Sequence, residues 1–389
     1  MFVAVALAFA SGRANAGSSA RSSEPPLVLF AGGVKTMKVA GIITLSSAEL
    51  FEPNRGSFVA TGSMSVARTG HTATRLKNGS ILIAGGSSQF FGGGTIFGSA
   101  ELFDPSRRRF SDTGAMLEAR IGHTATLLAN GNVLIACGND GTTSLPEAEL
   151  YDPASAAFAA TGAMSIGRDD CGAARLANGK VLIAGGFQLL SDGSGSVLDT
   201  AELYDPVTGS FGLTGTMTAA RQGPTASLLP NGKVLITGGV DNDGVVLDTA
   251  ELYDPTNGHF SQTGHMTTSR VGHLAAALGD GDVLVAGGIN NRGASLKSAE
   301  VFVAKTGKFV KVAAMPRDRF MVGATVLTSS TILIAGGYAQ CQSSDASFCL
   351  KPVKTALIFD HGSDTFRSIS PMTSTRGSFA SATLSHPAH

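Results

Sequence analysis

One set of residues recurs seven times along this 389-residue chain with constant internal spacing. Each copy has an acidic–apolar segment such as "AELFD", a phenylalanine nine residues after the glutamate position, and a methionine six residues later. An arginine follows four residues after each methionine, and a glycine pair begins 17 residues after the first six arginines, with Cys137 replacing one glycine. Repeats of roughly 20–50 residues form stacked units that share a core with their neighbours. The chain must therefore build its core between repeats.

Each copy spans 48 to 57 residues and holds four short apolar segments separated by turn residues such as Asn-Gly. Four strands per repeat are typical of a propeller blade. The chain begins with a second-strand segment, "PLVLFAGG", and ends with a first-strand segment, "RGSFASATLS". We therefore predict an all-β, seven-bladed β-propeller of four-stranded blades over residues 26–385. Its C-terminal strand joins the N-terminal strands, which closes the ring and removes exposed sheet edges.

The double glycine, the acidic–aromatic third strand and the outer aromatic resemble the kelch repeat. The resemblance covers nearly all of residues 26–385 and implies similarity to bacterial kelch propellers and to the central domain of galactose oxidase. Kelch repeats usually carry tryptophan as the outer aromatic, whereas this chain contains no tryptophan and uses phenylalanine. The resemblance implies a fold, and one fold hosts many functions.

The N-terminal segment lies outside the repeat pattern. The apolar run "FVAVALAFA" is too short to span a bilayer, and Ala14 and Ala16 form a small-residue cleavage pattern. We expect a signal peptide at 1–16, a flexible tether at 17–25 and a secreted or periplasmic protein. No lysine or arginine precedes the run, so a start further upstream, or a disordered tail on a cytoplasmic protein, is the alternative. With 29 basic and 29 acidic side chains, the charge balance argues against nucleic acid and anionic membranes as partners.

The stretch "ARIGHTATLL" places a histidine three residues after a repeat arginine. The equivalent residues of the seven copies are His71, His123, Cys171, Pro224, His273, Val322 and Phe379. Because proline and valine occupy the same position, we interpret it as a packing site at the start of the inner strand. His71, His123 and Cys171 come from consecutive blades, and imidazole with thiolate suits zinc or copper, so a metal site is the alternative. We expect neither a metal nor a cofactor.

The repeat arginines and glutamates are expected to pair within or between blades, where buried ion pairs define geometry more than they add stability. Leu357 replaces the seventh glutamate. We therefore expect Arg376, or a neighbouring arginine, to lack its partner and to be available to a ligand at the channel mouth.

All length differences between copies fall between the double glycine and the third strand. These loops and the crossings that carry the arginines should share one face, with the Asn-Gly turns on the other. Insertions on one face of a repeat protein often form its binding face. The alternative is that each loop packs on its neighbour. The candidate ligand-binding residues are Phe90, Phe91, Phe97, Phe187, Asp241, Asp243, Asn290, Asn291, Arg292, Tyr338 and Arg376.

The longest of these loops contains Cys341 and Cys349. Two cysteines eight residues apart in an exported protein predict a disulfide. Cys137 and Cys171 lie in adjacent blades, and the sequence leaves open whether they form a second bridge or remain buried thiols.

Three classes of function fit this chain. The first is a non-catalytic, monomeric binding module for a glycan or a protein. The second is a carbohydrate-active enzyme on the same fold, of the oxidase or sialic-acid epimerase type. Galactose oxidase holds copper with two tyrosines and two histidines, but three of this chain's four tyrosines occupy a repeat position, and no motif defines a reaction. The third is a purely structural surface protein. The sequence favours the binding module over an enzyme.

Overall fold

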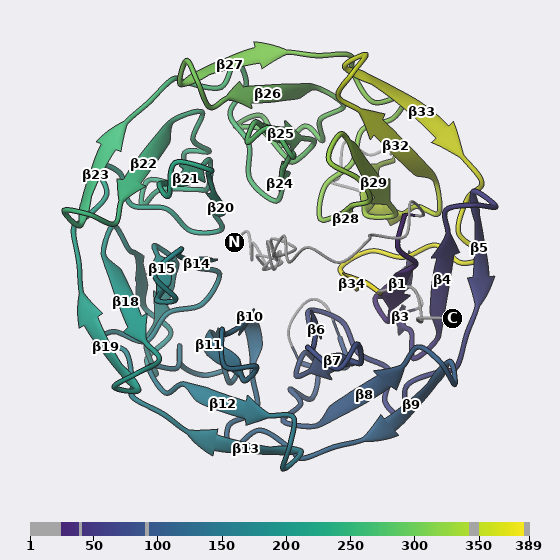
Figure 1. The fold of residues 1–389 in the computed structure, drawn as a ribbon, viewed down its shortest axis with the longest axis horizontal. Helices are drawn as coiled ribbons and strands as arrows, with labels where there is room; N and C mark the ends of the chain where they lie inside the picture. Colours follow the sequence, from purple (N-terminus) through teal and green to yellow (C-terminus); the bar gives the residue numbers. More distant parts are fainter. Residues whose placement is uncertain (1–24, 39–40, 90–92, 342–349, 385–389) are drawn as a thin grey trace.

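Seven four-stranded antiparallel sheets form a closed ring in the computed structural model, which describes residues 25–38, 41–89, 93–341 and 350–384 (Figure 1). This confirms the predicted seven-bladed all-β propeller. The predicted signal peptide and nearly all of the tether lie outside the described residues. Among the described residues, none belongs to a helix of the length and apolarity needed to cross a membrane.

The blades are numbered along the chain, and each is given from its inner to its outer strand. Blade 1 contains β34 (Ala380–Thr383), β1 (Val28–Ala31), β4 (Ala48–Glu52) and β5 (Ser57–Ala60). Blade 2 contains β6 (Thr72–Arg75), β7 (Ile81–Ala84), β8 (Ala100–Asp104) and β9 (Arg109–Asp112). Blade 3 contains β10 (Ile121–Leu127), β11 (Val133–Asn139), β12 (Glu149–Asp152) and β13 (Ala157–Ala160).

The remaining four blades repeat this order. Blade 4 contains β14 (Gly172–Arg175), β15 (Val181–Ala184), β18 (Ala201–Asp205) and β19 (Ser210–Leu213). Blade 5 contains β20 (Thr225–Leu228), β21 (Val234–Thr237), β22 (Ala250–Asp254) and β23 (His259–Gln262). Blade 6 contains β24 (Leu274–Ala277), β25 (Val283–Ala286), β26 (Ala299–Val303) and β27 (Lys308–Lys311). Blade 7 contains β28 (Gly323–Val326), β29 (Thr331–Ala335), β32 (Ala356–Asp360) and β33 (Thr365–Ile369).

Blade 1 joins the two ends of the chain. β34 pairs antiparallel with β1, from Val28 opposite Thr383 to Ala31 opposite Ala380. The amide of Leu384 also donates a 2.7 Å hydrogen bond to the carbonyl of Leu27. The C-terminal strand therefore supplies the inner strand of blade 1, as predicted, and covers an edge that β1 would otherwise expose.

The second strand of each blade explains the continuous apolar runs in the sequence. Segments such as "ILIA" and "VLIA" are buried at every position because they lie between two strands of their own blade and between two neighbouring blades. The third-strand aromatic packs on the outer phenylalanine in every blade, with ring centroids 4.8–5.1 Å apart. Phenylalanine therefore fills the outer aromatic position without tryptophan.

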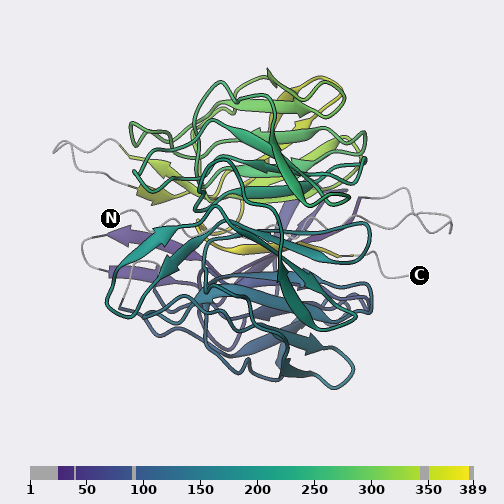
Figure 2. The ribbon, with the colours of Figure 1, turned by 90° about the vertical axis from the view of Figure 1, so that its left-hand side faces the viewer.

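The two faces of the ring differ in their connections. The second-to-third-strand loops and the interblade crossings share one face, here the loop face, while the short turns occupy the other, the turn face. Three loops extend into added hairpins, which project from the same side of the ring in Figure 2. They are β2–β3 (Val34–Lys38 and Gly41–Thr44), β16–β17 (Phe187–Leu189 and Gly195–Val197) and β30–β31 (Tyr338–Gln340 and Leu350–Pro352).

Candidate functional site

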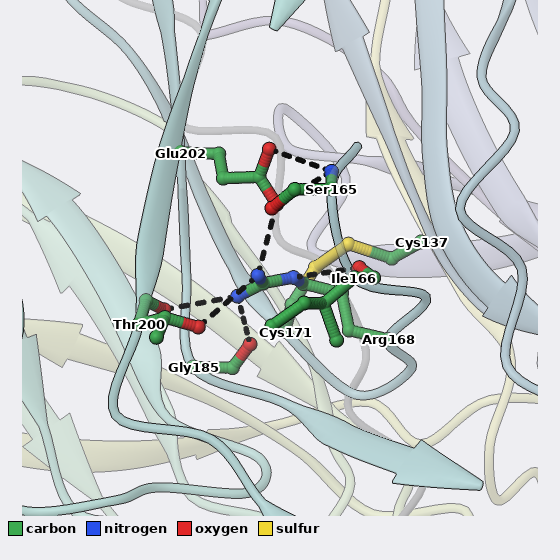
Figure 3. A network of polar contacts seen from close by, with 8 residues as sticks. All are labelled: Cys137, Ser165, Ile166, Arg168, Cys171, Gly185, Thr200 and Glu202. Atoms are coloured by element: carbon green, nitrogen blue, oxygen red, sulfur yellow. Dashed lines mark hydrogen bonds and ion pairs between the residues drawn. A yellow bond between two sulfur atoms is a disulfide. The ribbon is translucent and has the colours of Figure 1, made fainter. Parts of the chain in front are cut away.

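The repeat arginines hold the crossings to the blades that they enter. Arg168 shows the arrangement: its Nη1 donates to the carbonyls of Gly185 and Thr200, and its Nη2 lies 3.1 Å from Glu202 Oε1 (Figure 3). Glu202 in turn accepts the amide of Ser165 in the same crossing. Six arginines form such buried ion pairs at 2.8–3.2 Å: Arg68–Glu101, Arg120–Glu149, Arg168–Glu202, Arg221–Glu251, Arg270–Glu300 and Arg376–Glu49. These arginines serve the architecture.

Ring closure changes which arginine lacks a glutamate. Arg376 is almost fully buried and pairs with Glu49 of blade 1, so Arg376 is the wrong one of the two alternatives, Arg376 or a neighbouring arginine. Arg319 is the one that enters the blade with Leu357 in place of glutamate. Its guanidinium donates to the carbonyls of Gly336 and Thr355 and to the Thr355 hydroxyl. Burial lowers the pKa of Arg319 to about 10, against the opposing charge of Asp318.

The histidines of the inner strands are buried packing residues. A Cβ placed on Gly85 would lie 2.7 Å from the ring of His123 in the next blade, and Gly32 and Gly238 meet His71 and His273 in the same way. Burial and then the adjacent repeat arginine lower the pKa of each of the three histidines to about 3. The three rings therefore stay neutral at physiological pH.

One seam replaces the glycine–histidine contact with two cysteines. Cys137 stands at the first-glycine position with a φ of 62°, and Cys171 stands at the histidine position of the next blade. The two form a disulfide that joins blades 3 and 4. The alternative of a metal site at His71, His123 and Cys171 is therefore wrong, because the Cys171 sulfur is bonded to Cys137. The predicted Cys341–Cys349 bridge includes Cys349, which lies outside the described residues.

Several candidate loop residues stabilise their own loops. Asp241 Oδ1 accepts the amides of Asp243 and Val245, and Asn290 Oδ1 accepts those of Arg292 and Ala294. Asn291 reaches back to the previous blade, where its side-chain amide donates to the Val246 carbonyl at 2.8 Å and accepts the Val246 amide.

Asn242 makes the same clamp on Val197 of blade 4. The loops of blades 4, 5 and 6 are thus joined in series, and Asp243 and Arg292 remain exposed beside these clamps.

The aromatic candidates divide between packing and partial exposure. Tyr338 is fully buried against Phe320, with ring centroids 5.5 Å apart. Phe97 is partly buried beneath the Arg68 guanidinium, whose Cζ lies 5.5 Å from the ring centroid. Phe187 is partly exposed at the start of the β16–β17 hairpin. Phe90 and Phe91 lie outside the described residues.

The least repetitive polar arrangement of the loop face is here named the Asp169–Asp170 cluster, comprising Asn139, Ser144, Asp169, Asp170 and Gln222. Asp169 Oδ2 accepts Asn139 Nδ2 at 2.7 Å and Ser144 Oγ at 3.2 Å. Asp170 Oδ2 accepts Gln222 Nε2 at 3.2 Å. Both carboxylates are buried, whereas Asn139 and Gln222 are partly exposed. The cluster joins the crossings and loops of blades 3, 4 and 5.

Burial dominates the electrostatics of this cluster. It raises the pKa of Asp169 to about 6, although the hydrogen bonds from Asn139 and Ser144 oppose the shift. Asp170 has a φ of 49°, at a position where most blades have glycine. Its amide donates to the Gly122 carbonyl and its own carbonyl accepts the Gly223 amide, so the backbone is fixed between the neighbouring blades. Met321 and Ser378 have the same left-handed φ at the equivalent position, so this backbone conformation belongs to the repeat.

The sequence reasoning missed this cluster, although its signal was visible. "GRDDCG" is the one copy that puts two adjacent carboxylates after the repeat arginine. A buried carboxyl group with a raised pKa, next to partly exposed Phe187 and two side-chain amides, can bind hydroxyl and amide groups.

Comparison with known proteins agrees with the fold. Residues 224–267 and 270–316, which hold all four strands of blade 5 and of blade 6, match the Kelch motif. The structure of YjhT is similar with a TM-score of 0.59 at 15% sequence identity, covering 78% of this chain and 98% of that chain. None of the curated proteins matches the chain in sequence. The resemblance to kelch propellers is thereby confirmed, and the likeness to YjhT is one of fold.

Proposed function

We propose that this propeller is a non-catalytic binding module that holds a glycan or protein partner on its loop face. The observation that carries the proposal is the Asp169–Asp170 cluster beside the partly exposed Phe187. Elsewhere on the ring, the repeat arginines, glutamates and inner-strand histidines are buried in interblade contacts. The cluster instead combines amides that reach the surface with an aromatic ring. An aromatic face with amide and carboxylate groups favours a glycan, since a sugar offers apolar C–H faces and hydroxyl groups.

A location outside the cytoplasm belongs to the same proposal. The Cys137–Cys171 disulfide supports it, because disulfides persist in oxidising compartments and are rare in the cytosol. The candidate cleavage pattern before residue 17 supports it independently.

A glycan array tests the binding proposal. The wild-type protein should bind a subset of glycans, and Phe187→Ala and Gln222→Ala should each weaken that binding at least tenfold. The matched control is Arg107→Ala on the turn face, where the side chain is exposed and pairs with Asp104. Equal binding by all four proteins would contradict the assignment of the site. An array without any binding would contradict the glycan and direct the search to protein partners.

One observation favours a carbohydrate-active enzyme as the second candidate. A carboxyl group with a pKa near 6 can exchange a proton at neutral pH, as general acid–base catalysis needs. Copper-radical oxidation receives no such support, because the hydroxyls of Tyr151, Tyr204 and Tyr253 make interblade hydrogen bonds of 2.8–2.9 Å to threonines. NMR of sugars incubated with wild-type and Asp169→Asn protein tests the candidate: conversion lost only in the variant supports it, and unchanged sugars contradict it.

A further inference from the structure

A second polar constellation lies on the turn face at the seam between blades 6 and 7. His361 follows β32 of blade 7, and its Nε2 lies 3.0 Å from Asp280 Oδ2 and 3.8 Å from Asp282 Oδ2 in the β24–β25 turn of blade 6. The ligand atoms of these three residues all lie within 4.8 Å of one another. The other nitrogen of the His361 imidazole, Nδ1, lies 2.8 Å from Asp364 Oδ1.

Backbone hydrogen bonds hold the two carboxylates toward the histidine. Asp280 Oδ1 accepts the amide of Asp282 at 3.0 Å, and Asp282 Oδ1 accepts the amide of Ala304 at 2.9 Å. Each carboxylate therefore uses one oxygen to fix its orientation and presents the other to His361 Nε2. The His361 ring stacks on Phe359, with centroids 6.3 Å apart. The arrangement is preorganised on both sides of the seam.

These residues are not part of the repeat. Asparagine occupies the position of Asp280 in blades 2 to 5, and proline occupies the position of His361 in blades 1 to 5. Lysine stands at the position of Asp282 in blades 4 and 5, where Lys180 and Lys233 pair with Asp205 and Asp254. Because the other blades form the same turns with asparagine, lysine or proline at these positions, the fold of a blade does not require the two aspartates and the histidine. Binding of a ligand would explain their presence.

The tautomer of His361 decides whether its Nε2 can bind a cation together with Asp280 and Asp282. If Nδ1 carries the proton and donates it to Asp364, the Nε2 lone pair faces two carboxylates. Either a second proton, on Nε2, or a cation between Nε2 and those oxygens resolves this repulsion. A carboxylate that accepts the second ring N–H is also the usual outer partner of a metal-bound histidine.

We propose that Asp280, Asp282 and His361 bind one Zn²⁺ ion across the seam of blades 6 and 7, with Asp364 as the positioning residue behind His361. Zinc binds imidazole nitrogen and carboxylate oxygen at about 2.0–2.2 Å, so tetrahedral ligand atoms stand about 3.4 Å apart. The observed separations of 3.0 and 3.8 Å lie on either side of that value. The partly exposed side chains leave a fourth position open to water. The ion would join the two blades and is independent of the loop-face function.

Equilibrium dialysis of chelator-treated protein against ZnCl₂ at pH 7.5 tests the site. Wild-type protein should bind one Zn²⁺ per chain, and His361→Ala and Asp282→Asn should lose that binding. Asp364→Asn should weaken it about 10–100-fold while keeping the three ligands. The matched control is His265→Ala, which removes an exposed histidine 3.9 Å from Asp248 and should leave binding unchanged.

The results that overturn the proposal are equally definite. Wild-type protein without stoichiometric zinc would show that His361 is only a protonated partner of its carboxylates. Zinc retained by a folded His361→Ala protein would place the metal elsewhere. If His361→Ala does not fold, Asp364→Asn decides, because an affinity equal to that of wild type contradicts the assigned geometry.

Discussion

At the scale of single residues, the repeat arginine has different partners in different blades. Arg221 donates two hydrogen bonds to backbone carbonyls and pairs with Glu251, which is itself fully buried. Arg319 donates equivalent hydrogen bonds in blade 7, where Leu357 stands at the glutamate position. The two arginines therefore allow a comparison, within one molecule, between a crossing arginine that has a glutamate partner and one that has only backbone and hydroxyl acceptors.

This comparison yields a prediction about stability. Arg221→Met should lower the free energy of unfolding by about 3–5 kcal/mol, because it leaves the Glu251 carboxylate buried without its cation. Arg319→Met should cost only about 1–3 kcal/mol, since it leaves carbonyl groups but no glutamate behind. Urea unfolding of both variants checks the difference. Equal costs would mean that the ion pair adds nothing to the backbone hydrogen bonds.

The buried histidines predict how stability depends on pH. Their pKa of about 3 in the fold lies below the ordinary 6.5, so the unfolded chain binds more protons and the fold loses stability as pH falls below 6.5. From pH 7.5 to 5.5 each histidine costs about 1.4 kcal/mol. Asp169, whose pKa is raised to about 6, binds a proton more readily in the fold and offsets about 1 kcal/mol. The net loss from these four groups should be roughly 3 kcal/mol.

The variant His71→Phe checks this pH account, because blade 1 already has Phe379 at the equivalent position, directly before its inner strand β34. Its loss of unfolding free energy between pH 7.5 and 5.5 should be smaller than that of the wild type by about 1.4 kcal/mol. An unchanged pH dependence would show that His71 titrates normally in the fold.

At the scale of strands and loops, the sequence predicted much of the organisation. Fixed spacing identified the four strands of each blade, because every copy must bury the same second strand and pair the same aromatics. The loops were harder to predict, because their amides act across blades. Asn291 looked like a ligand-binding group, yet it clamps Val246 of the preceding loop. The Asp169–Asp170 cluster depends on residues from three blades, and only the ring brings them together.

The Cys137–Cys171 disulfide links the second strand of blade 3 covalently to the start of blade 4. Cys137 and Cys171 are 34 residues apart, and closing a loop of that length constrains the unfolded chain by about 3–4 kcal/mol. Cys137→Ser/Cys171→Ser protein should unfold at a correspondingly lower urea concentration. Wild-type protein treated with a reducing agent should unfold at a urea concentration no higher than that of the double variant, because the reducing agent also acts on the predicted Cys341–Cys349 bridge. Identical midpoints for oxidised and reduced wild-type protein would contradict a bridge at this seam.

At the scale of the whole molecule, the division between the faces follows from the ring. Each blade contributes one buried ion-pair position and one packing position to its neighbours, and these account for the repeat arginines, glutamates and inner-strand histidines. The two proposed sites consist of residues that differ between blades: the loop-face cluster of blades 3 to 5, and the turn-face histidine with its carboxylates at blades 6 and 7. The sequence could predict the ring because repeats encode it. The full partners of either cluster are harder to predict, because they are unrepeated residues that meet only when adjacent blades pack together.

Hydrogen–deuterium exchange of the closing strand pair tests the central claim, that the two chain ends complete one ring. Amides in β34 and β1 should be as well protected as those in the inner and second strands of blades 2 to 7, since β34 is the inner strand of blade 1. Rapid exchange in Ala380–Thr383, with protection elsewhere intact, would contradict closure and describe an open array of six blades and a frayed edge.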